Sequence, residues 1–330
     1  MKILVTGGSG FIGSNFINNQ IKNTDNKILN FDNLTYASNK DSLLSVKSSD
    51  RYSFIHGDIC DKNSVTNAFE KFLPNIVVHF AAESHVDNSI NEPDSFINTN
   101  INGTFNLLKI SLKYNSKDTV NDFKFIHIST DEVYGSIKSP DLFTENSPYR
   151  PNSPYSASKA ASDHLVRAWS KTYNLKTVIT NCSNNYGPYQ HTEKLIPLVI
   201  KNSLTLNHIP IYGDGLNVRD WLFVEDHCDA IYAIIKSGIP GQSYNIGGNN
   251  QLSNLSIVKK ICTILDKKRP REDTKKYSDL IKLVNDRPGH DRRYAVDFSK
   301  ISQKLLWKPK HTFDSGIEKT ISWYLKNNDW

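Results

Sequence analysis

Two side chains with complementary chemistry lie four residues apart in the segment Tyr155-Ser156-Ala157-Ser158-Lys159. On a helix, this spacing places both side chains on one face. An ammonium group close to a phenol lowers the pKa of the phenol, so a tyrosinate base becomes plausible near neutral pH. Spacing alone favours two ordinary helix-surface residues, because Tyr-x-x-x-Lys occurs often by chance. The pair is therefore a candidate for catalysis that needs a supporting context.

Two adjacent carboxylates provide part of that context. Asp131 and Glu132 follow Thr130 directly after an apolar run that reads as a strand. Side chains at the carboxyl end of such a strand point into the ligand crevice of an open α/β sheet. Two carboxylates can act as an acid and a base if their surroundings separate their pKa values. In isolation, the pair is more typical of the start of a helix than of a catalytic site.

A glycine-rich loop over residues 6–13 follows the first expected strand and opens a helix. Gly7 permits the tight turn, Gly10 permits a pyrophosphate to approach the backbone, and Gly13 permits the helix to pack on the sheet. The amino end of the helix favours the phosphate charge. Asp32 closes the next strand, 19 residues after Gly13. A carboxylate there can accept ribose hydroxyls and repel a 2′-phosphate, so the loop predicts NAD as the cofactor.

The elements that must position these residues alternate along the first half of the chain. Strands are expected at 2–6, 27–32, 52–57, 75–82, 123–129 and 177–182, and the clearest helices at 11–22, 95–114 and 154–173. This alternation predicts a parallel sheet buried on both faces, of the doubly wound Rossmann type in the α/β class.

Prolines interrupt this rhythm after residue 181, which predicts a smaller, interleaved C-terminal substrate-binding lobe. We expect a dinucleotide-binding domain over 1–182 and the smaller lobe mainly over 183–330. Segments near 214–247, with a strand at 243–246, are predicted to rejoin the first domain.

Composition excludes several classes of protein. The chain has 330 residues, 40 Lys and Arg against 34 Asp and Glu, and a net charge of +6 without a sustained basic stripe, so nucleic-acid binding is not expected. No apolar run approaches the ~18 residues of a membrane helix. The start of the chain does not resemble a signal peptide. Four cysteines, at 60, 182, 228 and 262, have no metal or disulfide spacing and predict reduced thiols in the cytoplasm.

Together, the glycine loop, the Tyr-x-x-x-Lys pair and the carboxylate pair resemble the extended short-chain dehydrogenases/reductases. The pair Asp131-Glu132 is typical, within them, of the nucleotide-sugar 4,6-dehydratases that act on dTDP-glucose. Further matching strings are Ala81-Ala82-Glu83-Ser84-His85-Val86-Asp87, Thr99-Asn100, Asn102-Gly103-Thr104, Asn181-Cys182-Ser183-Asn184-Asn185-Tyr186-Gly187-Pro188, Glu193-Lys194-Leu195-Ile196-Pro197, Pro210-Ile211-Tyr212-Gly213, Arg219-Asp220-Trp221, Tyr244-Asn245-Ile246-Gly247-Gly248 and Asp286-Arg287-Pro288-Gly289-His290-Asp291-Arg292-Arg293.

The resemblance implies a lyase that converts dTDP-glucose to dTDP-4-dehydro-6-deoxy-glucose and water, with NAD. It assigns proton removal from the 4-hydroxyl to Tyr155, proton removal from carbon 5 to Glu132, and protonation of the leaving 6-hydroxyl to Asp131. Thr130 would hydrogen-bond near the 4-oxygen, and Lys159 would hold the nicotinamide ribose. Another nucleotide-sugar dehydratase or a 4-epimerase stays open as an alternative. A non-catalytic NAD-sensing module is a further one.

The resemblance also implies two sets of binding residues and no metal. The cofactor set is Gly7, Gly10, Phe11, Ile12, Gly13, Asp32, Asn33, Leu34, Thr35, Asp58, Ile59, Phe80, Ala81, Ala82, Glu83, Ser84, Thr99, Tyr155, Lys159 and Asn185. The substrate set is Ser84, Thr130, Asn184, Lys194, Leu195, Pro210, Ile211, Tyr212, Arg219, Asn254, Asp286, Arg287, Pro288, Gly289 and His290.

The same resemblance implies a homodimer formed by the helices at 95–114 and 154–173. The expected seam includes Phe105, Leu108, Leu112, Leu165 and Trp169. The chain departs from the family pattern at Asn88, where arginine is common, and at 190–192, where Gln-His-Thr replaces a more apolar tripeptide.

Overall fold

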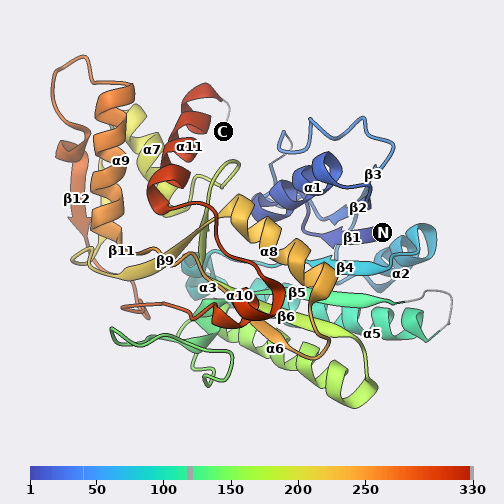
Figure 1. The fold of residues 1–330 in the computed structure, drawn as a ribbon. Coiled ribbons are helices and arrows are strands. Elements are labelled where there is room, and N and C mark those ends of the chain that lie inside the picture. Colours follow the sequence, from blue (N-terminus) through green and yellow to red (C-terminus); the bar gives the residue numbers. More distant parts are fainter. Residues whose placement is uncertain (40, 117–121, 328–330) are drawn as a thin grey trace.

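The computed structural model describes residues 1–39, 41–116 and 122–327 (Figure 1). Within them, a seven-stranded sheet has the order β10-β6-β5-β4-β1-β2-β3, and each neighbouring pair of strands is parallel. Its strands are β1 (Lys2–Thr6), β2 (Lys27–Asp32), β3 (Tyr52–His56), β4 (Ile76–His79), β5 (Lys124–Thr130), β6 (Thr177–Cys182) and β10 (Ser243–Ile246). The prediction of a Rossmann-type parallel sheet is confirmed.

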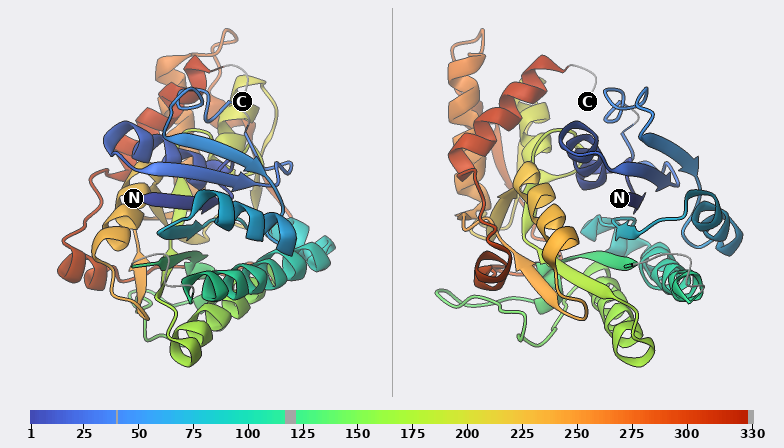
Figure 2. Two further views of the ribbon diagram at one scale, coloured as in Figure 1. Left: turned by 90° about the vertical axis from the view of Figure 1, so that its right-hand side faces the viewer. Right: turned by 45° about the vertical axis from the view of Figure 1, so that its right-hand side comes forward.

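Helices cover both faces of this sheet, as Figures 1 and 2 show. One face packs against α1 (Phe11–Asn23), α8 (Val224–Ser237) and α10 (Ser299–Leu305). The other packs against α2 (Lys62–Phe72), α5 (Thr104–Asn115) and α6 (Pro154–Tyr173). Burial on both faces explains why the strands read as nearly continuous apolar runs.

The helix expected at 95–114 is three consecutive pieces. After α3 (Val86–Asn91) come α4 (Pro93–Phe96), the π-helix η1 (Ile97–Gly103) and α5. Within η1, the Asn100 side chain accepts a hydrogen bond from the Glu83 N–H at 2.9 Å and donates to the Ser158 Oγ at 2.8 Å. The π segment therefore ties the loop after β4 to α6, and π-bulges are frequent at functional sites.

The strand expected at 75–82 is shorter than predicted, because β4 ends at His79. The chain turns away there as residues 80–84 pass close to the loop after β1. A Cβ on Gly7 would lie 2.5 Å from the backbone nitrogen of Ala81, so only a glycine permits this approach.

The smaller lobe has its own core. A three-stranded sheet has the order β11-β9-β7, and β8 and β12 form a parallel pair. The elements are β7 (Asn184–Tyr186), α7 (Leu195–Leu204), β8 (Ile209–Tyr212), β9 (Val218–Phe223), β11 (Gln251–Ser253), α9 (Asn254–Lys268), the 3-10 turn η3 (Tyr277–Leu280), β12 (Ile281–Val284) and α11 (Phe313–Lys326).

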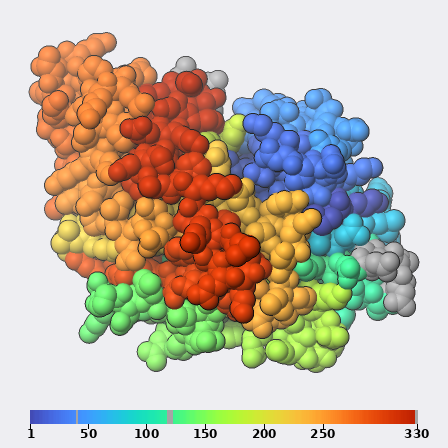
Figure 3. Space-filling view, in the orientation of Figure 1, coloured from blue at the N-terminus to red at the C-terminus, as the bar shows by residue number. Residues whose placement is uncertain are grey.

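The two parts of the molecule interleave along the chain. α8 packs on α1, and β10 pairs with β6, although both elements lie between β9 and β11 in the sequence. In the space-filling view, the C-terminal segments (orange and red) and the N-terminal segments (blue) lie on opposite sides of one face (Figure 3). The domain division at residue 182 stays a prediction. No helix in the described parts of the chain is both long and apolar enough to cross a membrane.

Candidate active site

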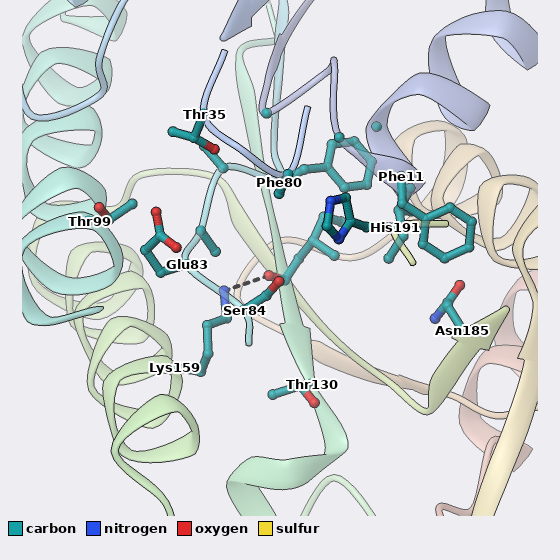
Figure 4. Close-up of a pocket in the computed structure, with 18 of the residues that line it drawn as sticks. Phe11, Thr35, Phe80, Glu83, Ser84, Thr99, Thr130, Lys159, Asn185 and His191 are labelled. Carbon is teal, nitrogen blue, oxygen red and sulfur yellow. Dashed lines mark hydrogen bonds between the residues drawn. The ribbon is translucent and has the colours of Figure 1, made fainter. Parts of the chain in front are cut away.

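A cavity of about 340 Å³ opens at the carboxyl ends of β1, β2, β4, β5 and β6. The strand order reverses between β1 and β4, where open α/β sheets bind their ligands. Most predicted site residues line it: Gly7, Gly10, Phe11, Ile12, Gly13, Asp32, Asn33, Thr35, Asp58, Ile59, Phe80, Ala81, Ala82, Glu83, Ser84, Thr99, Thr130, Asp131, Glu132, Tyr155, Lys159, Asn184, Asn185 and Lys194. Figure 4 shows side chains from both sides of this cavity.

The glycine loop lies at one end of the cavity. Gly7 has a φ of +70°, and a Cβ on Gly13 would lie 2.3 Å from the Gly7 carbonyl oxygen, so protein packing itself requires both glycines. Gly10 differs, because the nearest heavy atom to its Cβ position is the Gly7 oxygen at 3.3 Å. The space beside Gly10 is otherwise open, as the pyrophosphate of a dinucleotide requires.

Asp32 closes β2 at the same end. Its carboxylate accepts hydrogen bonds from the N–H groups of Ser9 and Leu34, both at 2.8 Å, and from the Ser38 hydroxyl at 3.2 Å. These donors hold the carboxylate at the cavity wall, where it can accept a ribose hydroxyl. The residues present therefore fit NAD. Leu34 donates its backbone N–H to this arrangement but does not line the cavity.

The start of α6 positions the candidate pair. Ser153 caps the helix by accepting the Ser156 N–H at 3.1 Å, and the Ser156 Oγ accepts the Ser153 N–H at 3.0 Å. Tyr155 thus lies in the first turn and Lys159 one turn later. The Lys159 ammonium donates to the Ile128 carbonyl oxygen at 2.8 Å, the bond drawn beside Lys159 in Figure 4.

The expected lowering of the Tyr155 pKa by Lys159 is wrong for the protein chain itself. Burial raises the pKa of Tyr155, and the Glu132 carboxylate raises it further, while a hydrogen bond with Thr130 acts in the opposite direction. Burial also lowers the pKa of Lys159, which the Asp163 carboxylate opposes. The reason is that both groups are buried and the ammonium bonds to a backbone carbonyl.

The two carboxylates lie in the 3-10 turn η2 (Asp131–Tyr134) that follows β5. Thr130 caps this turn by accepting the Glu132 N–H at 3.2 Å. Burial raises the pKa of Asp131, and the charges of Glu132 and Asp220 raise it further. Burial raises the pKa of Glu132 too, but Arg219 and two other cations oppose this shift. The surroundings thus raise the pKa of Asp131 more strongly than that of Glu132, so that Asp131 is the better acid-form partner of the two.

Three cations of the smaller lobe surround Glu132. Lys194 donates to the Ser84 carbonyl oxygen at 3.0 Å, Arg219 to the Asp291 carbonyl oxygen at 2.9 Å, and Arg287 to Asp87 at 3.2 Å. Two buried acceptors at this end, Asp131 Oδ2 and Asn184 Oδ1, have no hydrogen-bond partner within the described residues. Cations and open acceptors together suit an anionic ligand that carries hydroxyl groups.

Part of the predicted set lies outside the cavity lining: Leu34, Leu195, Pro210, Ile211, Tyr212, Arg219, Asn254, Asp286, Arg287, Pro288, Gly289 and His290. The Ile211 side chain is 2% exposed and belongs to the core of the smaller lobe. His290 pairs with Asp286 at 2.6 Å, and its ring lies 6.3 Å from that of Tyr212. The substrate roles of these residues stay predictions.

Sequence reasoning missed other lining residues: Phe31, Ala37, Ser38, Gly57, Ile128, Ser129, Cys182, Ser183, Gln190, His191 and Glu193. One signal could have found His191, because the chain departs from the family pattern at 190–192. The His191 ring lies 5.8 Å from that of Tyr36, whose hydroxyl accepts the Asn88 amide at 3.3 Å. Asn88 and His191, one residue from each departure, therefore both contact Tyr36.

The likeness to known proteins covers nearly the whole chain. A family model described as GDP-mannose 4,6 dehydratase matches residues 4–320. A dTDP-glucose 4,6-dehydratase of Salmonella typhimurium is 54% identical, over 100% of this chain and 94% of that protein. One from Neisseria meningitidis serogroup B is 53% identical over the same shares.

Solved structures agree with the sequence relatives. The dTDP-glucose 4,6-dehydratase DesIV of Streptomyces venezuelae, solved with NAD bound, is 41% identical with a TM-score of 0.92, over 100% of this chain and 98% of that one. The UDP-glucose 4-epimerase of Thermus thermophilus, in complex with NAD, is only 28% identical with a TM-score of 0.87, over 98% and 99% of the two chains. Since full-length identity above 50% is shared with the dehydratases, this chain belongs to the dTDP-glucose 4,6-dehydratase family of extended short-chain dehydrogenases/reductases.

Proposed function

We propose that the protein converts dTDP-glucose to dTDP-4-dehydro-6-deoxy-glucose and water, with NAD as its cofactor. One observation carries the proposal: Tyr155, Asp131 and Glu132 line the same cavity as the glycine loop. A phenol, an acid and a base beside a dinucleotide site are the groups that an oxidation followed by an elimination requires.

Tyr155 removes the proton of the sugar 4-hydroxyl. Only the deprotonated phenol can take this proton, and burial opposes that form by raising the pKa of Tyr155. Thr130 bonds to the phenol and is the residue placed to stabilise its deprotonated form. When bound, NAD would accept a hydride from carbon 4 and later return it to carbon 6, so that the reaction has no net oxidation. The 4-ketone acidifies the hydrogen on carbon 5.

Glu132 and Asp131 carry out the elimination. Glu132, whose ionised form Lys194, Arg219 and Arg287 favour, takes the proton from carbon 5 and gives it back to carbon 5 when the hydride returns to carbon 6. Asp131, whose pKa burial raises, gives its proton to the departing 6-hydroxyl, which leaves as water. Neighbouring carboxylates in unlike surroundings thus take the two opposite roles.

The alternative of a 4-epimerase fits the site less well. Epimerisation at carbon 4 needs the oxidation and its reversal, but no acid and base for an elimination. In an epimerase, the buried Asp131 and the cation-flanked Glu132 would have no role as general acid and base. A dehydratase for another nucleotide-sugar shares all of these features, so the nucleotide must be tested directly.

The test is mass spectrometry of dTDP-, UDP- and GDP-linked sugars after incubation with the protein and NAD. We expect a loss of one water from dTDP-glucose, without release of reduced cofactor. Stoichiometric release of reduced cofactor would indicate a simple dehydrogenase instead. Isomerisation of the sugar without a loss of mass would indicate an epimerase.

We also infer a cytoplasmic homodimer that forms through α5 and α6. These helices lie side by side in Figures 1 and 2, and Phe105, which is 39% exposed, contacts the Trp169 ring at 5.7 Å between centroids. Leu108 is fully buried within the protomer, so its expected place in the seam is wrong. Sedimentation at micromolar concentration tests this inference, and an active monomer would contradict it.

A further inference from the structure

One carboxylate bridges the two parts of the molecule just beyond the cavity. Asp87 lies in the first turn of α3, which packs on α6. Its Oδ1 lies 3.2 Å from Nη1 of Arg287, and its Oδ2 accepts the Tyr212 hydroxyl at 3.4 Å. Arg287 and Tyr212 both belong to the smaller lobe. A single side chain of the larger part thus bonds two side chains of the smaller one.

The bonded arginine still has donors to offer. Asp87 occupies one nitrogen of Arg287, while the Arg287 Nε is buried without a hydrogen-bond partner among the described residues. A guanidinium held from one side presents its remaining N–H groups in a fixed direction, which suits bidentate binding of a phosphate. An open buried donor beside Lys194 and Arg219 indicates that an anion completes the site.

The bonded tyrosine presents a second feature. Tyr212 ends β8 and is 42% exposed, so its ring is open to a flat ligand while its hydroxyl is held by Asp87. Aromatic faces bind nucleic-acid bases by stacking. Holding the hydroxyl and the guanidinium on one carboxylate sets the separation between the aromatic face and the phosphate-binding group.

We propose that Asp87 is a positioning residue for the nucleoside diphosphate part of the substrate. It orients the Arg287 guanidinium toward the diphosphate and the Tyr212 ring toward the base, and it acts through these two residues. This inference rests on the proposed function, since it deepens the description of the same substrate site. The alternative is that the Asp87 carboxylate competes with the diphosphate for Arg287. In that case, removing the carboxylate would strengthen the binding of the nucleotide.

The experiment is calorimetric titration of the NAD-saturated protein with dTDP, for the unchanged chain and for Asp87→Asn. The amide has nearly the shape of the carboxylate but loses the charge. We expect dTDP to bind about three- to tenfold more weakly, the effect of losing a charged hydrogen bond at a partly exposed position. The KM for dTDP-glucose should rise in parallel, while kcat changes less than about twofold.

The chain offers a matched control. Asp214 pairs with Arg292 at 2.8 Å, and both side chains are more than half exposed and lie outside the cavity lining. Asp214→Asn breaks an arginine–carboxylate pair of the same kind and should leave dTDP binding unchanged. In a background of Arg287→Gln, the further change Asp87→Asn should weaken dTDP binding by less than it does alone, because the guanidinium that Asp87 orients is already absent.

The outcomes separate the two proposals. If the unchanged chain neither binds dTDP nor dehydrates dTDP-glucose, the proposed function fails. If the unchanged chain does both and Asp87→Asn binds dTDP equally well or more tightly, the positioning role is wrong. A fall in kcat without a change in KM would also contradict it. Coincident thermal unfolding of the unchanged chain and Asp87→Asn would show that the variant is folded.

Discussion

The two ends of the cavity are built in different ways. At the cofactor end, backbone and small side chains form the wall, from turns that directly follow β1, β2 and β4. Glycines there permit approaches that a Cβ would block, as between Gly7 and Ala81. At the substrate end, charged side chains of the smaller lobe surround Glu132, which follows β5 of the large sheet.

This difference shows that the two ends of the site depend on different physical properties. The cofactor end depends on shape, since the groups that would hold a dinucleotide are backbone N–H groups and an acceptor, Asp32. The substrate end depends on charge, since Lys194, Arg219 and Arg287 offset the cost of burying Glu132. Substitutions that change shape but not charge should damage the first end, and substitutions that change charge but not shape should damage the second.

The largest effect is expected from a change of charge at the substrate end. Glu132→Gln keeps the shape but removes the base, so turnover should fall ~10²–10⁴-fold. Oxidation at carbon 4 should still proceed, and the absorbance of reduced nicotinamide should build up on the protein after mixing with dTDP-glucose. Tyr155→Phe should produce no such absorbance, because it blocks the earlier step. Full product formation by Glu132→Gln would remove Glu132 from its assigned role.

A change of shape should have the next largest effect, at the cofactor end. Gly7→Ala adds a Cβ at a φ of +70° and 2.5 Å from the Ala81 nitrogen, so both NAD affinity and the free energy of unfolding should fall. Gly241→Ala is the matched control, because its φ is +80° but the nearest heavy atom is the Ser170 Oγ at 3.3 Å.

Both variants share the cost of the left-handed conformation, about 1–2 kcal/mol. The clash should make Gly7→Ala less stable than Gly241→Ala by about a further 1–3 kcal/mol in urea unfolding. Weaker NAD binding should be confined to Gly7→Ala. Equal stability and equal NAD binding in the two variants would show that the loop tolerates a Cβ, and that shape does not govern this end.

The smallest effect concerns stability against pH. Burial raises the pKa of Asp131 in the folded state, so its charging opposes folding as the pH rises above the unfolded value of about 4. Asp131→Asn should therefore gain stability relative to the unchanged chain as the pH rises, with no gain in acid. Asp214→Asn should instead lose stability relative to the unchanged chain as the pH rises. Arg292 lowers the pKa of Asp214, so the ionised carboxylate stabilises the folded chain above the unfolded pKa, and the variant lacks this stabilisation. Urea midpoints between pH 3 and pH 8 measure both, and parallel curves would contradict the two assignments.

Much of the molecule follows from local patterns in the chain. The strands that build the large sheet were predicted to within a few residues, because strands buried on both faces must be apolar along their length. The glycine loop, Asp32, Asp131-Glu132 and Tyr155-Lys159 all line one cavity, as expected from their places at strand ends and on a helix. Each of these motifs lies within a short segment of the chain, so it can be recognised from neighbouring residues alone.

Only the tertiary structure decided how these groups behave. The sequence suggested that Lys159 lowers the pKa of Tyr155, but the fold buries both groups and directs the ammonium to the Ile128 carbonyl oxygen. It also joined Asp87 to Arg287 across 200 positions of sequence. Desolvation and Coulomb energies depend on which distant residues come together. The identity of the chemical groups is therefore local information, whereas their protonation and partners belong to the folded molecule.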